Sequence, residues 1–247
     1  MAQRDAILAY AAELLDLDAY PDYGPMGLQV EGAEEVTKIA CGVSASLALF
    51  ERAVAQNAQL LIVHHGLFWD SDSRRVDGPM RRRLQALFDA DITLAAYHLA
   101  LDAHPEVGNN ALLAKALGIE PRERFAGIGF GGPLRPPTEA QRFARRVAEK
   151  LGREPLVFPH GPDEVKRAAV VTGRGGRYFA DAAAAGYDLF LTGEAEEPAL
   201  HLARELGVHY VAAGHYATER LGVQALAKNL AEHFGIEADY VELGNPV

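Results

Sequence analysis

An internal repeat is the feature that most restricts how this chain of 247 residues can fold. The segment EVTKIACGVS, which starts at residue 35, matches EVKRAAVVTG, which starts at residue 164, an offset of 129. Each copy continues as an alanine-rich amphipathic segment, over 47–58 and 178–186, and then as an apolar run. This order is typical of a β-α-β unit. It predicts partly parallel sheets that are covered by helices.

Each copy of this repeat ends on side chains that commonly bind metals. The apolar run 60–63 is followed by His64 and His65, and the corresponding run 189–191 is followed, after Thr-Gly, by Glu194. In α/β folds, ligands usually bind at the carboxyl ends of parallel strands. We therefore expect these side chains to contribute to a binding site.

A second pair of matching segments strengthens the repeat. LAAYHLALD starts at residue 94 and VAAGHYATE at residue 211, an offset of 117, which aligns His98 with His215 and Asp102 with Glu219. Chance similarity between alanine-rich segments is the alternative explanation, but both matches end on residue types that bind metals. We therefore expect an α/β fold of two intertwined copies of one module, with mixed sheets covered by helices and a metal site between the copies.

The two offsets also locate the ends of the copies. Since 129 exceeds 117 by 12 residues, the first copy carries an insertion between His65 and Leu94, in a segment with the composition of a loop and a helix start. Glycine and proline concentrate at 121–139. We therefore place the first copy at 1–124 and the second at 125–247. The motif Gly-x-Gly-x-x-Gly in this region precedes several prolines, so it indicates a turn rather than a dinucleotide site.

Packing of the two copies about a pseudo-twofold axis would bring together imidazoles and carboxylates without a thiolate. Such a set suits Zn, Fe, Mn or Ni. If two ions bind about 3.5–4 Å apart, a carboxylate can bridge them, and Glu219 is our candidate for the bridge. Any one histidine alone is better explained by a hydrogen bond to a backbone carbonyl at a strand end. The whole set favours a metal site: His64, His65, His98, Asp102, Glu194, His215 and Glu219.

Charge and hydropathy exclude several other classes of protein. The chain has 24 Lys and Arg against 34 Asp and Glu, a net charge of −10, which disfavours nucleic-acid binding. It has no apolar run of about 18 residues for a membrane span, and its N-terminus lacks the apolar core of a signal peptide. The single cysteine, Cys41, excludes internal disulfides and indicates a buried, inert thiol. We therefore expect a cytoplasmic protein.

Several motifs occur in an order that resembles a known family. They are GLQV at 27–30, LLIVHHGLF, YHLALD, Gly-Asn-Asn at 108–110, FLTGE and GHYATE. This ordered set resembles the NIF-three-like family, whose bacterial members are described as GTP cyclohydrolase I type 2 homologues. The resemblance implies a dinuclear metal centre and a toroidal homohexamer.

The resemblance also implies which residues hold two divalent metal ions. His98 and Glu194 match positions that line the site in the family. The chain differs from the family at two places around the site. Leu99, Ala100 and Leu101 stand where the family has a polar Thr-Asn pair. Only His201 follows Glu194, where many members have paired histidines. The implied metal ligands are His64, His65, Asp102, His215 and Glu219.

These expectations lead to a functional hypothesis with open alternatives. We expect a metal-dependent hydrolase that acts on a small molecule, by resemblance a nucleotide such as GTP, with His98 or Glu194 transferring a proton. Phe68 and Trp69 could stack on a purine or pack beneath the inserted loop. A metal-dependent phosphoesterase and a non-catalytic metal carrier or regulatory scaffold are the alternative functions.

Overall fold

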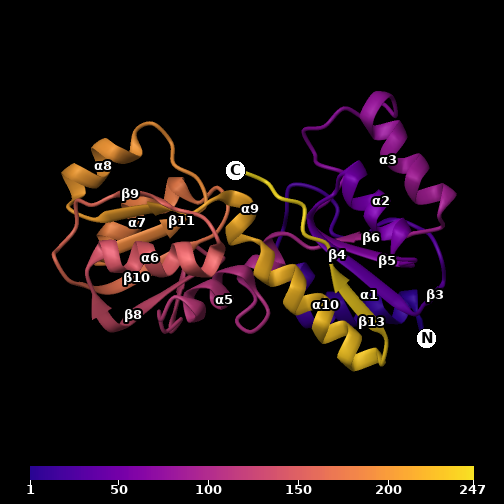
Figure 1. Ribbon diagram of the computed structural model, residues 1–247, viewed down its shortest axis with the longest axis horizontal. Helices are drawn as coiled ribbons and strands as arrows, with labels where there is room; N and C mark the ends of the chain where they lie inside the picture. Colours follow the sequence, from indigo (N-terminus) through magenta and orange to yellow (C-terminus); the bar gives the residue numbers. More distant parts are fainter. The chain divides into compact units, whose positions relative to one another are not determined.

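A mixed β-sheet forms the centre of each of two units of the chain (Figure 1). The computed structural model describes all residues, Met1–Val247. The first unit consists of Met1–Leu101 and Gly222–Gly244, and the second of Asp102–Leu221 and Asn245–Val247. The predicted α/β class with mixed, helix-covered sheets is confirmed. The division into copies at residue 124 and their intertwining stay predictions.

The sheet of the first unit has five strands, four of them parallel. Only β2 runs antiparallel, against β6. The final strand of the chain, β13, closes the opposite edge by pairing with β4. In sheet order the strands are β13 (Glu237–Tyr240), β4 (Lys38–Ser44), β5 (Leu60–His65), β6 (Thr93–Ala96) and β2 (Gly27–Val30).

Helix α2 (Leu47–Ala55) shows how the first sheet acquires its cover. The side chain of Ser46 accepts a hydrogen bond from the backbone N–H of Leu49 and so caps the first turn of the helix. Leu49 and Phe50 are buried in one cluster with alternate residues of β5. The helix ends three residues before the predicted Ala58, because Asn57 adopts a left-handed conformation with a φ of 55°.

The other elements of the first unit are short or lie at its ends. The stretch between His65 and Leu94, where we expect the insertion, has the predicted form of a loop that leads into a helix, α3. Helix α10 starts with Arg220 and Leu221 of the second unit and continues into the first. The elements are β1 (Ala2–Gln3), α1 (Arg4–Leu15), η1 (Leu17–Ala19), β3 (Glu35–Val36), α3 (Gly78–Asp89) and α10 (Arg220–Phe234).

The sheet of the second unit repeats the same central arrangement of three parallel strands. β10, β11 and β12 are parallel, and antiparallel strands flank them on both sides. Of the Gly-x-Gly-x-x-Gly motif predicted as a turn, only Gly127 lies in the turn between β7 and β8, because Gly129 and Gly132 belong to β8. In sheet order the strands are β7 (Glu123–Phe125), β8 (Gly129–Thr138), β10 (Val165–Val171), β11 (Leu189–Thr192), β12 (His209–Ala212) and β9 (Leu156–Phe158).

Helices cover both faces of this second sheet. Val170 is buried in one cluster with Phe143 of α6, whereas the next residue of β10, Val171, is buried in another cluster with Phe179 of α7. Since successive strand residues point to opposite faces, α6 and α7 lie on opposite faces. The helices are α5 (Asn109–Ala116), α6 (Ala140–Leu151), α7 (Phe179–Ala184) preceded by η2 (Gly176–Tyr178), α8 (Ala199–Leu206) and α9 (His215–Thr218).

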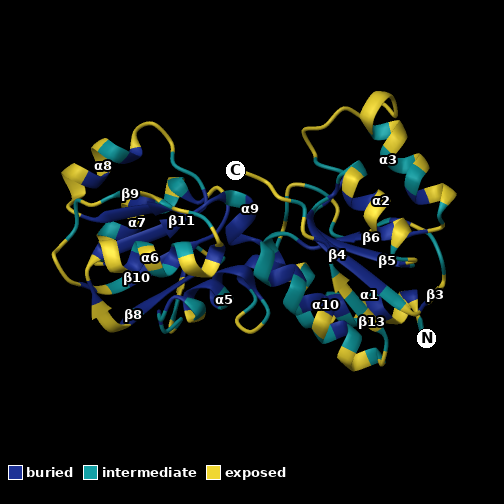
Figure 2. Ribbon diagram, viewed as in Figure 1, coloured by how far each residue is buried: buried dark blue, intermediate teal, exposed yellow.

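Burial follows this layered arrangement in both units. Figure 2 shows the central strands as buried and the outward faces of the helices as exposed. The buried strands read as near-continuous apolar runs because helices cover both of their faces. None of the helices is both long enough and apolar enough to cross a membrane.

Candidate metal centre

Three histidines gather at the carboxyl ends of two neighbouring strands of the first unit. His64 and His65 are the last residues of β5, and His98 follows the end of β6. One ligand nitrogen from each ring lies within 4.8 Å of the other two. His64 is fully buried, and the other two rings are partly buried. The predicted grouping of these three histidines is therefore present.

Neighbouring strand ends fix the orientation of the first two rings. Nδ1 of His64 lies 2.9 Å from the backbone oxygen of Tyr97, directly after β6. Because a carbonyl oxygen only accepts, Nδ1 of His64 donates, and Nε2 is its candidate ligand nitrogen. Nδ1 of His65 lies 3.0 Å from Oγ of Ser44, the last residue of β4. Hydrogen bonds of this kind set the ring orientation of metal-binding histidines.

The third ring is held by Asp22, a residue whose role the sequence did not indicate. Nδ1 of His98 lies 2.8 Å from Oδ1 of Asp22, and the N–H of Leu99 donates to Oδ2 at 2.8 Å. Burial alone would raise the pKa of Asp22, but the hydrogen bonds and charge that it receives outweigh burial, so its pKa is lowered. Asp22 is therefore a buried, ionised acceptor whose side chain is 2% exposed.

An aromatic side chain and a cavity lie beside these histidines. The Trp69 ring meets the His98 ring edge-on, with centroids 5.2 Å apart, and its centroid is 6.3 Å from that of His65. The inserted loop, Trp69 included, encloses a cavity of about 220 Å³. Aromatic, acidic and cationic side chains line it together, including Phe68, Trp69, Asp70, Asp72, Arg74 and Arg75.

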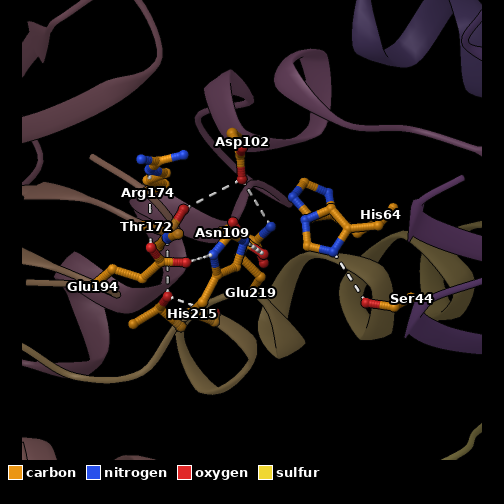
Figure 3. Close-up of polar contacts among 12 residues, drawn as sticks. Ser44, His64, Asp102, Asn109, Thr172, Arg174, Glu194, His215 and Glu219 are labelled. Atoms are coloured by element: carbon orange, nitrogen blue, oxygen red, sulfur yellow. Dashed lines mark hydrogen bonds and ion pairs between the residues drawn. The ribbon is translucent and has the colours of Figure 1, made fainter. Parts of the chain in front are cut away.

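The second unit places imidazole and carboxylate groups at the corresponding strand ends (Figure 3). Thr172 follows β10, Glu194 follows β11 after one glycine, and His215 begins α9 after β12. Glu219 lies directly after α9, four residues from His215. The repeated topology thus brings polar side chains to one edge of this sheet too, as the sequence predicted.

Asp102 is positioned by two buried neighbours in the second unit. Its Oδ1 accepts a hydrogen bond from Nδ2 of Asn109 at 2.9 Å and another from Oγ1 of Thr172 at 3.3 Å. The adjacent Asn110 accepts from the N–H of Thr172 at 2.7 Å and donates to the backbone oxygen of Asp102 at 3.2 Å. These bonds hold the Asp102 carboxylate in place between α5 and β10.

Two carboxylates hold the ring of His215. Nδ1 lies 2.6 Å from Oε1 of Glu194, and Nε2 lies 3.0 Å from Oε2 of Glu219. Burial lowers the pKa of His215, but these hydrogen bonds and charges outweigh burial and raise the pKa to about 9. Arg174 lies 4.0 Å from Glu194 on the side away from the ring, and 3.4 Å from Glu196.

Gly173 permits the close approach of the Glu219 carboxylate. Its φ is +61°, and a Cβ at this position would lie 2.1 Å from Oε1 of Glu219. Any side chain would therefore meet both an unfavourable backbone conformation and a clash. The N–H of Gly173 donates to Oγ1 of Thr218 at 3.1 Å, which ties the strand end to α9.

The donor groups of both units have the chemistry of a transition-metal site. Asp102 and Glu219 are 3% and 2% exposed, and their ligand oxygens lie within 4.8 Å of each other. Two buried carboxylates at this separation require compensating positive charge; the protonated His215 ring supplies part of it to Glu219, and a metal ion would supply the rest. Imidazole and carboxylate donors suit Zn, Fe, Mn or Ni. The chain therefore holds candidate groups for binding a divalent metal.

The structure places every residue that the sequence singled out for the site. The first unit brings together His64, His65 and His98, and the second brings together Asp102, Glu194, His215 and Glu219. His201 lies outside both sets, exposed on α8 and 3.9 Å from Glu197. The sequence did not indicate that Asp22 or Ser44 would position a ring. Asn109 is part of the Gly-Asn-Asn motif at 108–110, but the sequence did not indicate its hydrogen bond to Asp102.

Relatives of the chain are found by sequence. The model of the Duf34/NIF3 (NGG1p interacting factor 3) family matches residues 2–244. A protein of Pseudomonas aeruginosa named GTP cyclohydrolase 1 type 2 homolog is 46% identical over 241 residues, which cover 96% of this chain and 95% of that protein. A protein of the same name in Haemophilus influenzae is 44% identical over 237 residues and covers 94% of each chain.

Solved structures agree with this relationship. The structure of protein ybgI, described as of unknown function, has a TM-score of 0.97 and 42% identity, with all of both chains covered. TTHA1606 from Thermus thermophilus has a TM-score of 0.94 and 37% identity, again over all of both chains. The family resemblance drawn from the ordered motifs is thus confirmed. The chain belongs to the Duf34/NIF3 family.

Proposed function

We propose that the protein is a metal-dependent hydrolase with two divalent ions, and that its substrate resembles a nucleotide. The observation that carries this proposal is the provision, in each unit, of oriented metal-ligand side chains at the carboxyl ends of parallel strands. The proposed ligands are His64, His65, Asp102, His215 and Glu219, with Glu219 as the bridge between the ions.

The state of these side chains supports a metal centre over a purely structural role. A histidine that only satisfies a strand end needs one partner, yet His215 has a carboxylate on each ring nitrogen. Asp102 and Glu219 are buried close together with one imidazolium beside Glu219, so a divalent ion would compensate the remaining negative charge. When bound, a pair of divalent ions lowers the pKa of a coordinated water and polarises the bond under attack.

Other side chains of the protein would bind and orient the substrate. The ring of Trp69 offers an apolar face on which a purine can stack, whereas Phe68 packs against the core of the first unit, and the cavity beside them has a suitable size for part of a nucleotide. Arg74 and Arg75, on the same loop, can contact phosphate oxygens. Glu194 and His98 are the candidates for transferring a proton at the site.

The names of the relatives point to the same substrate class. Proteins 44–46% identical to this chain are named GTP cyclohydrolase 1 type 2 homolog. Ring opening of GTP by hydrolysis is therefore the first reaction to test. A phosphoesterase is the second candidate, because a pair of divalent ions suits the cleavage of phosphoesters and Arg74 and Arg75 can contact a phosphate group.

Turnover by the metal-loaded protein tests this proposal. The full-length chain is loaded in turn with Mn, Fe and Zn and incubated with GTP, other nucleotides and model phosphoesters. We expect turnover of at least one nucleotide, lost in Glu219→Gln and unchanged in His201→Gln, which alters an exposed histidine outside both sets. Cleavage of simple phosphoesters alone would favour the phosphoesterase. Tight metal binding without any turnover would contradict both and favour a metal carrier or scaffold.

We also propose that the protein assembles as a homohexamer, as the family resemblance implies. Light scattering on the purified full-length chain tests this assembly. Six chains of 26.7 kDa predict a mass of about 160 kDa. The mass of a single chain in solution would contradict the hexamer and leave the proposed metal ligands unaffected.

A further inference from the structure

The turn that follows β10 carries an exposed cation at the sheet edge that holds the candidate ligands of the second unit. Arg174 lies in this turn between Gly173 and Gly175, and its side chain is 72% exposed. The N–H of Gly173 donates to Oγ1 of Thr218 at 3.1 Å. The N–H of Gly175 donates to Oγ1 of Thr192 at 2.9 Å. The backbone is therefore fixed on both sides of Arg174, while its side chain extends into solvent.

The two glycines leave position 174 as the place in this turn for a long side chain. A Cβ on Gly173 would lie 2.1 Å from Oε1 of Glu219. A Cβ on Gly175 would lie 2.7 Å from the side chain of Val171. Both flanking positions thus exclude a side chain, and Arg174 is the residue between them that places a charge at this edge.

The guanidinium group of Arg174 makes no hydrogen bond within the chain. Its nearest carboxylate oxygens are Oε1 of Glu196 at 3.4 Å and Oε2 of Glu194 at 4.0 Å, and both distances are measured from Nε. The two terminal nitrogens lie farther from these carboxylates, on the side away from Glu194 (Figure 3). Since each terminal nitrogen carries two hydrogens, the donors that best match a phosphate are unused.

Other arginines of the second unit are bound to the chain itself. Nη1 of Arg153 donates to the backbone oxygen of Pro246 at 2.8 Å, and Nη1 of Arg146 donates to that of Leu117 at 2.6 Å. Such contacts tie one segment of the fold to another. Arg174 has no partner of this kind, so its side chain is available to a ligand.

Neither carboxylate near Arg174 occupies it fully. Glu194 is the closer partner of His215, whose Nδ1 lies 2.6 Å from its Oε1. Glu196 is 51% exposed, and an ion pair between two exposed side chains contributes little to stability. A phosphate group binds a guanidinium through two parallel hydrogen bonds, which the contact with Glu196 lacks. A phosphate would therefore displace Glu196 at a small cost.

A cation at this edge also changes how a phosphate is received there. Glu194 and Glu219 flank His215, and the ligand oxygen of Asp102 lies within 4.8 Å of that of Glu219. These carboxylates attract a metal ion, but they repel a phosphate. The positive charge of Arg174, 4.0 Å from Glu194, offsets part of this repulsion.

We propose that Arg174 binds a phosphate group of the substrate and that Glu196 is the exposed anion which this phosphate displaces. This inference rests on the proposed function, and it adds a substrate-binding residue of the second unit to Arg74 and Arg75 of the inserted loop. It also assigns a preference, because a phosphorylated substrate should bind more tightly than the same nucleoside without phosphate.

Binding of inorganic pyrophosphate, GTP and guanosine to the full-length chain tests this assignment without turnover. Calorimetric titrations are made on the zinc-loaded chain and on chain stripped of metal and dialysed. We expect Arg174→Gln to weaken the binding of pyrophosphate and GTP about tenfold and to leave guanosine unaffected. Arg174→Lys should recover part of the loss, because an ammonium group keeps the charge but not the two parallel hydrogen bonds.

Two further variants separate a direct contact from a general effect of charge. Arg177→Gln removes the same charge three residues away, where the side chain lies over the ring of Tyr178, and should match wild type. Glu196→Gln removes the competing anion, so it should tighten pyrophosphate binding by up to about fivefold. An arginine that only paired with Glu196 for stability would not give these opposite effects.

The outcomes distinguish this inference from the proposed function. Unchanged pyrophosphate affinity in Arg174→Gln, or equal losses in Arg174→Gln and Arg177→Gln, would overturn the inference and leave Arg74 and Arg75 as the phosphate contacts. A wild type that binds neither pyrophosphate nor GTP would overturn it as well. Binding that depends on Arg174 but is followed by no turnover would support the inference and contradict the proposed hydrolase.

Discussion

Oε1 of Glu194 lies 2.6 Å from Nδ1 of His215, and this contact fixes one ring nitrogen while the other faces Glu219. With a carboxylate on each side, the ring of the metal-free chain binds two hydrogens and carries a positive charge. A metal ion at Nε2 would replace one of those hydrogens. The protonation of the His215 ring therefore links pH, the stability of the fold and metal binding.

The stability of the metal-free protein should fall as the pH rises. The folded-state pKa of His215, about 9, lies above the ordinary value of 6.5, so its contribution is fully present below pH 6.5 and is lost as the pH passes 9. We expect a loss of roughly 3 kcal/mol in the free energy of unfolding from this group. Denaturant unfolding in a chelator at pH 6 and about 9.5 measures it. Identical pH profiles for wild type and His215→Gln would contradict the prediction.

Substitution of Gly173 should disturb the Glu219 carboxylate. In Gly173→Ala the new Cβ would lie 2.1 Å from Oε1 of Glu219 in a backbone with a φ of +61°. We expect a destabilisation of about 2–4 kcal/mol, together with weakened metal binding. Gly235→Ala is the matched control, because its φ is +64° and a Cβ there meets nothing within 4 Å. Equal effects of the two substitutions in thermal unfolding and metal titration would show that the clash with Glu219 is unimportant.

Removal of the amide that holds Asp102 should affect both stability and metal affinity. Asn109 is fully buried and donates to Oδ1 of Asp102, so Asn109→Ala removes a hydrogen bond to a buried acid. We expect a loss of about 1–3 kcal/mol in stability and a roughly 10–100-fold loss in metal affinity. Asn245→Ala, at an exposed hydrogen bond near the C-terminus, should change stability by less than about 0.5 kcal/mol. Wild-type metal affinity in Asn109→Ala would contradict the assigned role.

Cys41 should be unreactive in the folded protein. Burial within β4 raises its pKa to about 12, so the reactive thiolate is scarce at pH 8. Mass spectrometry after treatment with iodoacetamide should find no adduct on the native chain and a complete adduct after denaturation. Rapid alkylation of the native chain would show that the strand opens or that the thiolate is stabilised.

The sequence predicted the parts of the fold that depend on local patterns. An apolar run that ends in His64 and His65 indicated a buried strand with ligands at its carboxyl end, and β5 has this form. The repeat predicted the equivalent β-α-β unit that contains α7 and β11. These features depend on residues that are neighbours along the chain, so periodicity and composition reveal them.

The positioning residues depend on contacts between distant segments, and the sequence did not reveal them. Asp22 lies in a connecting segment with no periodic pattern, and its partner His98 is 76 residues away. Ser44 and His65 are 21 residues apart and meet only because β4 and β5 pair in parallel register. Such partners follow from the register of the sheet, which composition and periodicity do not determine.

Metal content per chain tests the central claim most directly. The full-length protein is purified without a tag and analysed by elemental mass spectrometry before and after reconstitution with Mn, Fe and Zn, beside His65→Ala. We predict about two metal ions per wild-type chain and a loss of metal in the variant. A wild type that retains no metal after all three reconstitutions would contradict the dinuclear centre and leave His65 with a structural role.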